Sequence, residues 1–419
     1  MSREGLEGAK ILILIGGHLA TAPRPLKEAT ALQSSGAKVM VRGIWWDPQL
    51  ADEDVSLARQ GSFDFAPAVD VNRGIGIRVR QRLAREGFTR FGMVTPRTFG
   101  IGAPELLREA RRIGADLTMV HSEAGLWVGQ KLMAERRRVG VDFEDWFSHD
   151  LAESDRKGRP VAALQALERT MLRQAQCCLT TTRVLAEALA ADARTSRVPS
   201  VVPNCFPAAE REAALTGARD SRAGGAVSFH WFSQTIGPGR GLETLAQSLP
   251  LLRGKWQLNL RGSLHGHSEW FEATFPPSIR SRIQILEIVP NADLLARTMS
   301  HDVGLALEEP YCASKDLTAA NKLFEYMRAG LAVIATRTRG QEEVLRTIPD
   351  VGVLIDPEDP NELARAMQAM IDDPKLVQAR RERAAAAAES TWSWERHAPT
   401  LINSISAAVE SGYTCRSMP

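Results

Sequence analysis

Three polar side chains, Asn321, Lys322 and Glu325, lie at a predicted strand-to-helix turn. The apolar run 303–307 predicts a buried strand before them, and apolar spacing over 321–328 predicts a helix that carries them in its first turns. Open parallel sheets bind ligands at such turns, and a helix N-terminus beside a lysine favours an anion. The pattern therefore predicts an anion-binding turn. The alternative is a solvated Lys322–Glu325 pair, worth ~0.2–0.5 kcal/mol.

Other predicted strands also end in polar residues. Gly16-Gly17-His18 follows the strand predicted at 10–15, and the glycines allow a ligand to approach the backbone closely. His121 follows the strand at 117–120, and Asp142 and Glu144 lie in the stretch 139–146. The dinucleotide motif G-x-G-x-x-G is absent, and Arg42 stands where an NAD site would offer an acid, so NAD binding is disfavoured.

Strands alternate with helices through both halves of the chain, which predicts two doubly wound parallel sheets. A polar stretch rich in Gly, Ala, Arg and Glu, 208–225, is interpreted as the interdomain connection. The predicted domains are residues 1–207, residues 208–390, and a C-terminal helical segment 391–419 that returns to the first domain.

Composition narrows the class of protein. The 419 residues are 44% hydrophobic and 24% charged, as in a soluble globular chain with two domains. Residues 1–208 carry 29 Lys and Arg against 24 Asp and Glu, an excess of +5, which is too mild for a nucleic-acid protein. No apolar run approaches the length of a membrane helix, and the start has too short an apolar run for a secretory signal. Five cysteines without C-x-x-C spacing favour a reducing cytoplasm.

With these motifs in order, the chain resembles the GT-B glycosyltransferases, specifically the large retaining family 4, or group 1, which uses nucleotide sugars. The resemblance spans nearly the whole chain. It rests on the following motifs: Gly16-Gly17-His18 with Pro23-Arg24, His121, Val141 to Trp146, Val202-Pro203-Asn204, Gly237-Pro238-Gly239-Arg240-Gly241, and Asn321 to Tyr326 with Gly330.

The resemblance implies two Rossmann-like domains that face a central cleft, with the donor bound by the second domain and a hydroxyl acceptor by the first. The implied catalytic residues are His121, Arg240 and Lys322. The implied donor-binding residues are Gly17, Gln234, Gly237, Gly239, Arg240, Asn321, Lys322 and Glu325. The acceptor candidates are His18, Asp142 and Glu144. Lys322 and Arg240 would face the diphosphate and Glu325 the ribose hydroxyls, with no metal ion and no other cofactor required.

Two departures from the family pattern leave other functions open. Leu317 stands where the family commonly has a second Glu, with Asp316 or Glu309 as substitutes, and Gln234 stands where many relatives have Arg. A non-catalytic sugar-nucleotide-binding subunit of a polysaccharide assembly complex is therefore an alternative, and a GT-B epimerase a weaker one. His121 also has a structural interpretation, as a histidine satisfied at a strand end. The basic run 136–138 is expected to be a solvated face, although anionic lipids attract such runs, so a place at the inner face of the membrane stays open.

Overall fold

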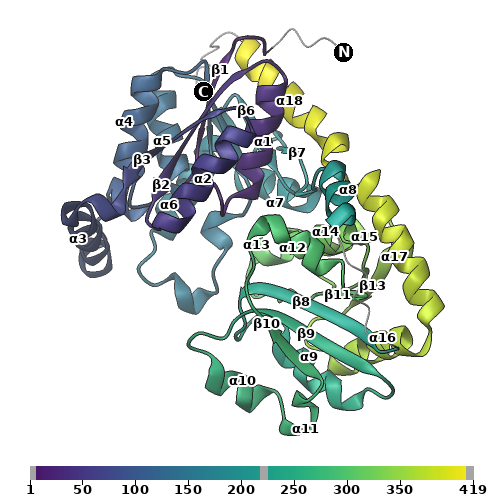
Figure 1. Cartoon of the computed structure of the whole chain (residues 1–419). Helices are drawn as coiled ribbons and strands as arrows, with labels where there is room; N and C mark the ends of the chain where they lie inside the picture. The colour runs from purple at the N-terminus through teal and green to yellow at the C-terminus, as the bar shows by residue number, and fades with distance from the viewer. Residues whose placement is uncertain (1–5, 218–224, 412–419) are drawn as a thin grey trace. The chain divides into compact units, whose positions relative to one another are not determined.

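The protein is described here by a computed structural model, which covers residues 6–217 and 225–411. The chain divides into two compact units (Figure 1). The first unit holds the residues up to Val202 and those from Ala398 onward, and the second unit holds 203–397. The segment 218–224, part of the predicted connection, lies outside the described residues, as do 412–419 and with them Cys415.

The sheet of the first unit runs in the order β3-β2-β1-β4-β5-β6-β7, with every pairing parallel. Ile11 to Leu14 of the interior strand β1 are completely buried, as expected for an aliphatic run covered on both faces by helices. The strands are β1 Lys10–Leu14, β2 Lys38–Trp45, β3 Asp64–Asp70, β4 Leu117–Val120, β5 Val139–Phe143, β6 Cys177–Thr180 and β7 Ser200–Val201.

Helices connect these strands and cover the sheet (Figure 1). They are α1 Pro23–Ser34, α2 Pro48–Gln60, α3 Ile75–Phe91, α4 Ala103–Ile113, α5 Ser122–Ala134, α6 Val161–Gln174 and α7 Arg183–Asp192. The final helix, α18 Trp394–Glu410, begins in the second unit and ends in the first. Thr182 caps α7 as its sequence predicts, because its side chain accepts a hydrogen bond from Leu185 N.

The second unit has a sheet in the order β10-β9-β8-β11-β12-β13, again parallel throughout. The strands are β8 Val227–Thr235, β9 Trp256–Ser263, β10 Ile283–Leu286, β11 Val303–Ala306, β12 Ala332–Thr336 and β13 Gly352–Ile355. The helices are α8 Ala208–Gly217, α9 Leu242–Ser248, α10 Ser268–Thr274, α11 Pro277–Arg280, α12 Asn291–Thr298, α13 Ala313–Leu317, α14 Asn321–Arg328, α15 Arg339–Leu345, α16 Pro360–Asp372 and α17 Pro374–Glu389. The predicted fold class of two doubly wound parallel sheets is confirmed.

The stretch predicted as the interdomain connection contains helix α8, which packs within the second unit. Arg211 donates a hydrogen bond to Arg328 O and pairs with Glu389, so α8 is anchored to the second unit. The division also falls earlier than residue 207, because Cys205 lies in the core of the second unit and Phe206 forms a parallel bridge with Ser393. Among the described residues, no helix is both long enough and apolar enough to cross a membrane.

Candidate functional site

The polar residues of the second unit gather where its strand order reverses. From β8 the chain first adds β9 and β10 on one side, and then β11, β12 and β13 on the other. The carboxyl ends of β8 and β11 are therefore neighbours whose connections leave in opposite directions, which is where open parallel sheets bind ligands. The loop with Gly237 to Gly241 follows β8, and Glu308 and Glu309 follow β11.

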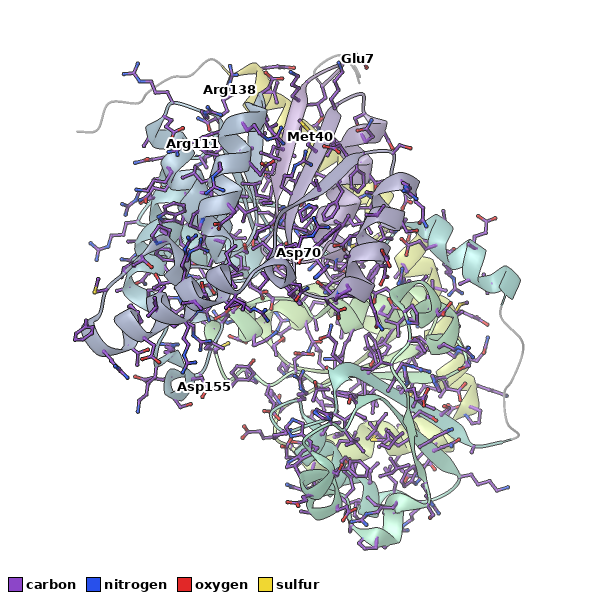
Figure 2. The ribbon with its side chains drawn as sticks, turned by 60° about the vertical axis from the view of Figure 1, so that its left-hand side comes forward. Glu7, Met40, Asp70, Arg111, Arg138 and Asp155 are labelled. Carbon is purple, nitrogen blue, oxygen red and sulfur yellow. The ribbon has the colours of Figure 1, made fainter. Side chains whose placement is uncertain are left out.

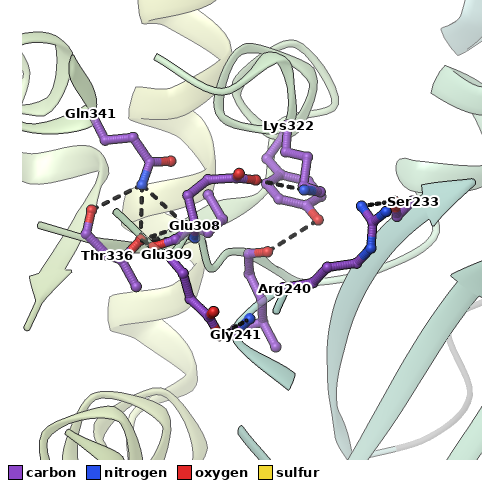
Figure 3. A network of polar contacts seen from close by, with 11 residues as sticks. Ser233, Arg240, Gly241, Glu308, Glu309, Lys322, Thr336 and Gln341 are labelled. Carbon is purple, nitrogen blue, oxygen red and sulfur yellow. Dashed lines mark hydrogen bonds and ion pairs between the residues drawn. The ribbon is translucent and has the colours of Figure 1, made fainter. Parts of the chain in front are cut away.

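Lys322 is held at this point by a carboxylate and an aromatic ring. Its Nζ donates a hydrogen bond to Glu308 Oε1 at 2.6 Å (Figure 3). The same Nζ lies 5.5 Å from the centre of the Trp231 ring. Burial acts to raise the pKa of Glu308, but Lys322, with smaller contributions from Lys315 and Arg240, holds that pKa below its ordinary value. The pair is thus ionised, with a half-buried cation on the first turn of α14.

The segment that carries Glu308 is locked to the next strand. The Thr336 hydroxyl accepts a hydrogen bond from Glu308 N at 2.8 Å and donates one to Glu308 O at 2.7 Å. Buried Gln341 adds a further tie, because its Nε2 donates to Thr336 O at 2.9 Å and to Ala306 O at 3.2 Å (Figure 3). Glu308 is therefore fixed by backbone contacts, and its side chain is free to take Lys322 as its partner.

The glycine loop after β8 approaches the end of β11 closely. Gly241 has φ +73°, and a Cβ atom on it would lie 2.6 Å from Leu307 Cβ, so no larger residue fits without movement. Its N–H donates to Glu309 Oε1 at 2.8 Å, while Gly239 N–H donates to Glu243 at 3.3 Å. Carboxylates thus accept hydrogen bonds from two N–H groups of this loop.

Arg240 and the other exposed donor candidates lie on the same loop or next to it. Arg240 is exposed, and its Nη1 donates to Ser233 Oγ at 3.1 Å (Figure 3). Gln234 and Gly239 are exposed too, whereas Gly237 is buried and packs against His267. The structure therefore brings Arg240 and Lys322, which are 82 residues apart in sequence, to one edge of one sheet.

Glu325 lies deeper in α14 than its predicted partners. The side chain is 3% exposed, and Oε2 accepts a hydrogen bond from Arg328 Nε at 2.7 Å. Its other carboxylate oxygen has no hydrogen-bond partner among the described residues. Burial raises the pKa of Glu325, and Arg328 opposes that rise. Asn321, one turn earlier on the same helix, is exposed.

The position of the missing second Glu is buried. Leu317 at the end of α13 is 1% exposed, so its side chain belongs to the core. Of the two proposed substitutes, Asp316 accepts hydrogen bonds from Arg339 N and Nε at 3.0 and 2.6 Å. Glu309 contacts the glycine loop instead, so Glu309 is the acid nearer to the predicted diphosphate site.

In the first unit the strand order reverses between β1 and β4, and His121 lies there after β4. The ring is buried, and both of its nitrogens contact carboxylates: Nδ1 lies 2.7 Å from Glu144 Oε1 and Nε2 lies 3.0 Å from Glu28 Oε2. Burial acts to lower the pKa of His121, but Glu28 and Glu144 raise that pKa well above its ordinary value. His121 is thus an imidazolium that donates to two acids.

Arg24 and Asp142 complete this cluster. Arg24 Nε donates to Asp142 Oδ2 at 2.7 Å, and its Nη1 donates to Val202 O at 2.6 Å. Burial acts to raise the pKa of Asp142, yet Arg24 holds it below the ordinary value. Burial and the negative charge of the neighbouring Asp142 carboxylate raise the pKa of Glu28 to about 8. Two cations then balance two anions and one neutral acid.

Glu28, His121 and Asp142 have the residue types of a metal site. Each offers a ligand atom within 4.8 Å of the other two. The Arg24 guanidinium lies against Asp142, however, and both His121 nitrogens already contact carboxylates, so a second cation here would meet strong repulsion. We interpret the cluster as an ion-pair network. Its solvent-exposed member is Glu144, whose side chain is 30% exposed.

His18 supports two loops from inside the unit. Its Nδ1 lies 2.8 Å from Asp54 Oδ2, and its Nε2 accepts hydrogen bonds from Trp46 N and Asp47 N at 3.0 and 3.1 Å. Those two donors fix the tautomer with the proton on Nδ1. His18 and Asp142 are completely buried, so of the predicted acceptor residues solvent reaches Glu144.

Gly17 packs against Trp46, since a Cβ atom on this glycine would lie 2.5 Å from the indole ring. Trp46 itself is 45% exposed.

Several residues that contact the predicted site residues were not predicted from the sequence. The acidic run 52–54 contains Asp54, which contacts His18 in the loop after β1. The stretch 45–65 contains α2, whose start is signalled by Asp47 as N-cap and Pro48 at the first helical position. Glu28 and Glu308 carried no signal, because each gains its role only from a residue on a different strand or helix.

Comparison with known proteins agrees with this geometry. Residues 231–373 match the profile of the family described as Glycosyl transferases group 1. No curated protein gives a significant match. Among solved structures, the Anabaena protein Alr3699/HepE in complex with UDP is 14% identical, with a TM-score of 0.68 over 95% of this chain and 100% of that one.

Two further structures show how widely the fold is shared. Sucrose-phosphate synthase from Thermosynechococcus elongatus is 17% identical, with a TM-score of 0.64 over 93% of this chain and 96% of that one. A UDP-N-acetylglucosamine 2-epimerase is 12% identical, with a TM-score of 0.54 over 94% of each chain. At such identities the likeness establishes the fold alone, which is that of the GT-B proteins.

The profile match is more specific than the fold. It covers about a third of the chain, from β8 to the end of α16, and includes Arg240, Glu308, Lys322 and Glu325. This segment matches the group 1 glycosyltransferases, so the predicted resemblance to that group and the predicted enzyme class, a glycosyltransferase, are confirmed.

Proposed function

We propose that the protein transfers a sugar from a nucleotide diphosphate sugar to a hydroxyl acceptor, with retention of configuration and without a metal ion. The observation that carries the proposal is the pair of cations, Lys322 and Arg240, at the strand reversal of the segment that matches the family. Negative charge develops on the diphosphate as the sugar leaves, and cations placed there stabilise the transition state more than the ground state.

Lys322 can exchange its present partner, Glu308, for a phosphate of the donor. Its present counter-ion, Glu308, is held by its own backbone contacts to Thr336, so the lysine can turn to a phosphate without loss of the loop. Arg240 is exposed on the glycine loop and has one hydroxyl partner, so it can move toward the same group. Two protein cations supply the charge that a divalent ion would otherwise provide.

Glu325 is proposed to bind the ribose. Its buried carboxylate oxygen without a partner is costly to leave unsatisfied, and a ribose hydroxyl would supply the missing donor. Glu309 next to Gly241 is the carboxylate that we propose contacts the donor sugar in place of the acid absent at 317. In the first unit, Glu144 is the proposed contact to the acceptor, with His121 behind it as the group that holds its charge and position.

Retention requires that the acceptor attack the face from which the diphosphate departs. The departing diphosphate can then take the proton from the acceptor hydroxyl, and no protein nucleophile is needed. The catalytic contribution of this chain is therefore electrostatic and positional, through Lys322, Arg240 and the loop that holds them.

The experiment is a donor screen with two readouts. Thermal shift with UDP, GDP and ADP identifies the base, since a ligand at 100 times its Kd adds about 2.7 kcal/mol to stability. Release of that nucleotide from its sugar form by slow hydrolysis then tests catalysis. Glu325→Ala should weaken the nucleotide shift. A folded Glu325→Ala protein with full affinity and full turnover would remove Glu325 from the site.

A non-catalytic sugar-nucleotide-binding subunit is the second candidate, favoured by the buried Leu317 in place of an acid. It predicts a thermal shift with a nucleotide sugar and no release of nucleotide. An epimerase predicts conversion of the donor to an isomer without any acceptor. The same incubation, followed by chromatography of the nucleotide sugars, separates all three.

We also propose a reducing compartment, on the cytoplasmic side. Cys177 and Cys178 are buried and carry free thiols. Such thiols persist where disulfides are not formed. Mass spectrometry of alkylated protein from cells would test this.

A further inference from the structure

Helix α3 is the least buried helix of the first unit and projects from its edge (Figure 1). None of its residues is buried, although it is a 17-residue helix. It packs against the rest of the unit through the half-buried residues Ile77, Ala84 and Phe88, and it contacts the short helix Pro96–Thr98. Most of its surface therefore faces solvent.

The solvent-facing side of α3 is apolar along one line. Ile75, Val79 and Leu83 are four residues apart, which places them on one stripe of the helix, and Ile75 and Leu83 are 73% and 66% exposed. Phe91 at the end of the helix is 75% exposed, and Met93 just beyond it is exposed as well. A contiguous apolar stripe of this kind marks an interaction surface, since isolated apolar side chains need no such explanation.

Arginines flank this stripe. The segment 75–94 contains one acid, Glu86, against five exposed arginines: Arg78, Arg80, Arg82, Arg85 and Arg90. Between α3 and Ile101 lies a cavity of about 580 Å³ that four of these arginines line: Arg78, Arg82, Arg85 and Arg90. Glu86 pairs with Arg90, which leaves the other three cations of the cavity with no acid partner among the described residues. The complementary ligand is an anion of the size of a phosphate headgroup.

We propose that α3 docks on the surface of an anionic phospholipid bilayer. The apolar stripe would enter the boundary of the acyl chains, and the arginines would extend from the same helix to the lipid phosphates, as in helices that lie in a membrane interface. A nucleic acid would use the arginines but would leave the apolar stripe exposed to water, so the bilayer fits the whole surface better.

The basic run 136–138 does not offer such a surface. Arg137 donates hydrogen bonds to Ala110 O and Arg111 O, and Arg138 donates one to Ser411 O. It also precedes β5, at the amino edge of the sheet, whereas α3 follows the carboxyl end of β3 at Asp70. Figure 2 shows Arg138 and Asp70 at opposite edges. α3 thus leaves the edge that carries His121 and Glu144, so a bilayer bound there lies on the side of the proposed acceptor residues.

The test is sedimentation of the full chain with vesicles of phosphatidylcholine alone and of equimolar phosphatidylcholine and phosphatidylglycerol. We expect binding to the anionic vesicles that weakens as salt is raised. Two triple variants should each reduce binding roughly tenfold or more. Ile75→Ser/Val79→Ser/Leu83→Ser removes the apolar stripe that would enter the acyl-chain boundary. Arg78→Gln/Arg82→Gln/Arg85→Gln removes three charges, and every arginine near an anionic surface contributes to binding. The matched control, Arg59→Gln/Arg108→Gln/Arg194→Gln, removes three exposed charges elsewhere in the same unit and should stay within about twofold of wild type.

Hydrogen exchange on the wild type provides a readout that does not depend on the variants folding. Peptides within 75–94 should become protected on anionic vesicles. Equal binding to both vesicle types, unchanged binding by both α3 variants, or no protection of 75–94 would overturn the proposal. Dimers that form without vesicles and are lost in the serine variant would assign the surface to a second copy of the chain instead. Stabilisation by inorganic phosphate without vesicle binding would reduce it to a site for a free anion.

Discussion

The two strand reversals of this protein carry similar residue types in different states. In the first unit, Arg24, His121 and Asp142 are buried and exchange hydrogen bonds with one another and with Glu28 and Glu144. In the second unit, Lys322 is half-buried on one counter-ion, and Arg240 is exposed. A buried network of balanced charges resists rearrangement, because the loss of any one partner leaves a charge that is shielded from water and unpaired. The ion pairs at the first reversal therefore fix the local structure, whereas the cations at the second reversal can exchange a protein partner for a ligand.

The largest expected difference concerns stability. Arg24→Met should lower the free energy of unfolding of the first unit by ~3–5 kcal/mol, because Asp142 is left buried without its cation. Lys322→Met should cost the second unit less, roughly 1–3 kcal/mol, because the side chain of Glu308 is 18% exposed whereas that of Asp142 is completely buried. Hydrogen exchange of peptides within 139–146 and 303–328 reports each unit separately. Equal costs in the two units would break the comparison.

Lys322→Met should instead lower kcat. Loss of one group that stabilises the departing charge costs on the order of 10²–10³ in rate. Lys255→Met is the matched control, because Lys255 is an exposed lysine that precedes β9 at the opposite edge of the same sheet. Steady-state nucleotide release with the donor found by thermal shift measures both. An unchanged kcat for Lys322→Met would remove the lysine from the chemistry.

The glycine loop offers a paired test at two neighbouring positions. Gly241→Ala combines a left-handed backbone with a Cβ only 2.6 Å from Leu307 Cβ. Its cost should be ~2–4 kcal/mol. Gly239→Ala has φ +70° and nothing closer than 4.0 Å, so roughly 1–2 kcal/mol is expected from the backbone alone. Urea unfolding compares them, and a smaller effect at 241 than at 239 would contradict the close approach.

The first unit should lose stability as pH rises. The pKa of Glu28, raised to about 8, means that the native unit keeps a proton that the unfolded chain loses near 4.5. Between these values the contribution of Glu28 falls with rising pH, by up to ~1.4 kcal/mol per pH unit. Glu28→Gln should remove that slope in unfolding measured across this range. A slope that persists in the variant would place the proton elsewhere in the cluster.

The second unit contains a group whose contribution to stability changes with pH in the opposite direction. Burial, with Arg261 nearby, lowers the pKa of His301 to about 4, and its ring stacks on His230 at 4.2 Å. Between about 4 and 6.5 the unfolded chain binds a proton that the native unit refuses, so the contribution of His301 rises with pH. His301→Asn should flatten this rise, by a smaller amount than Glu28→Gln changes the first unit. Unfolding of the second unit followed by hydrogen exchange measures it.

The sequence by itself determined the helices and strands, and it showed which strand ends are followed by polar residues. The apolar run before Glu308, the helical period over 321–328 and the glycines at 237–241 are local signals, and each depends on backbone sterics within a few residues. The structure has β11, α14 and a close-packed glycine loop at these places. Helix α2 was also within reach, since Asp47 and Pro48 are a recognisable start.

Only the tertiary structure decided which of those residues meet. Lys322 faces Glu308, His121 faces Glu28 and His18 faces Asp54, pairs that lie 14, 93 and 36 residues apart. Parallel sheets bring the carboxyl ends of non-consecutive strands together, so these distances in sequence carry no information about contact. The exposure of α3 was decided in the same way. Its arginines and apolar residues are plain in the sequence, but whether an apolar stripe is covered depends on what packs against it, and local propensity does not encode that.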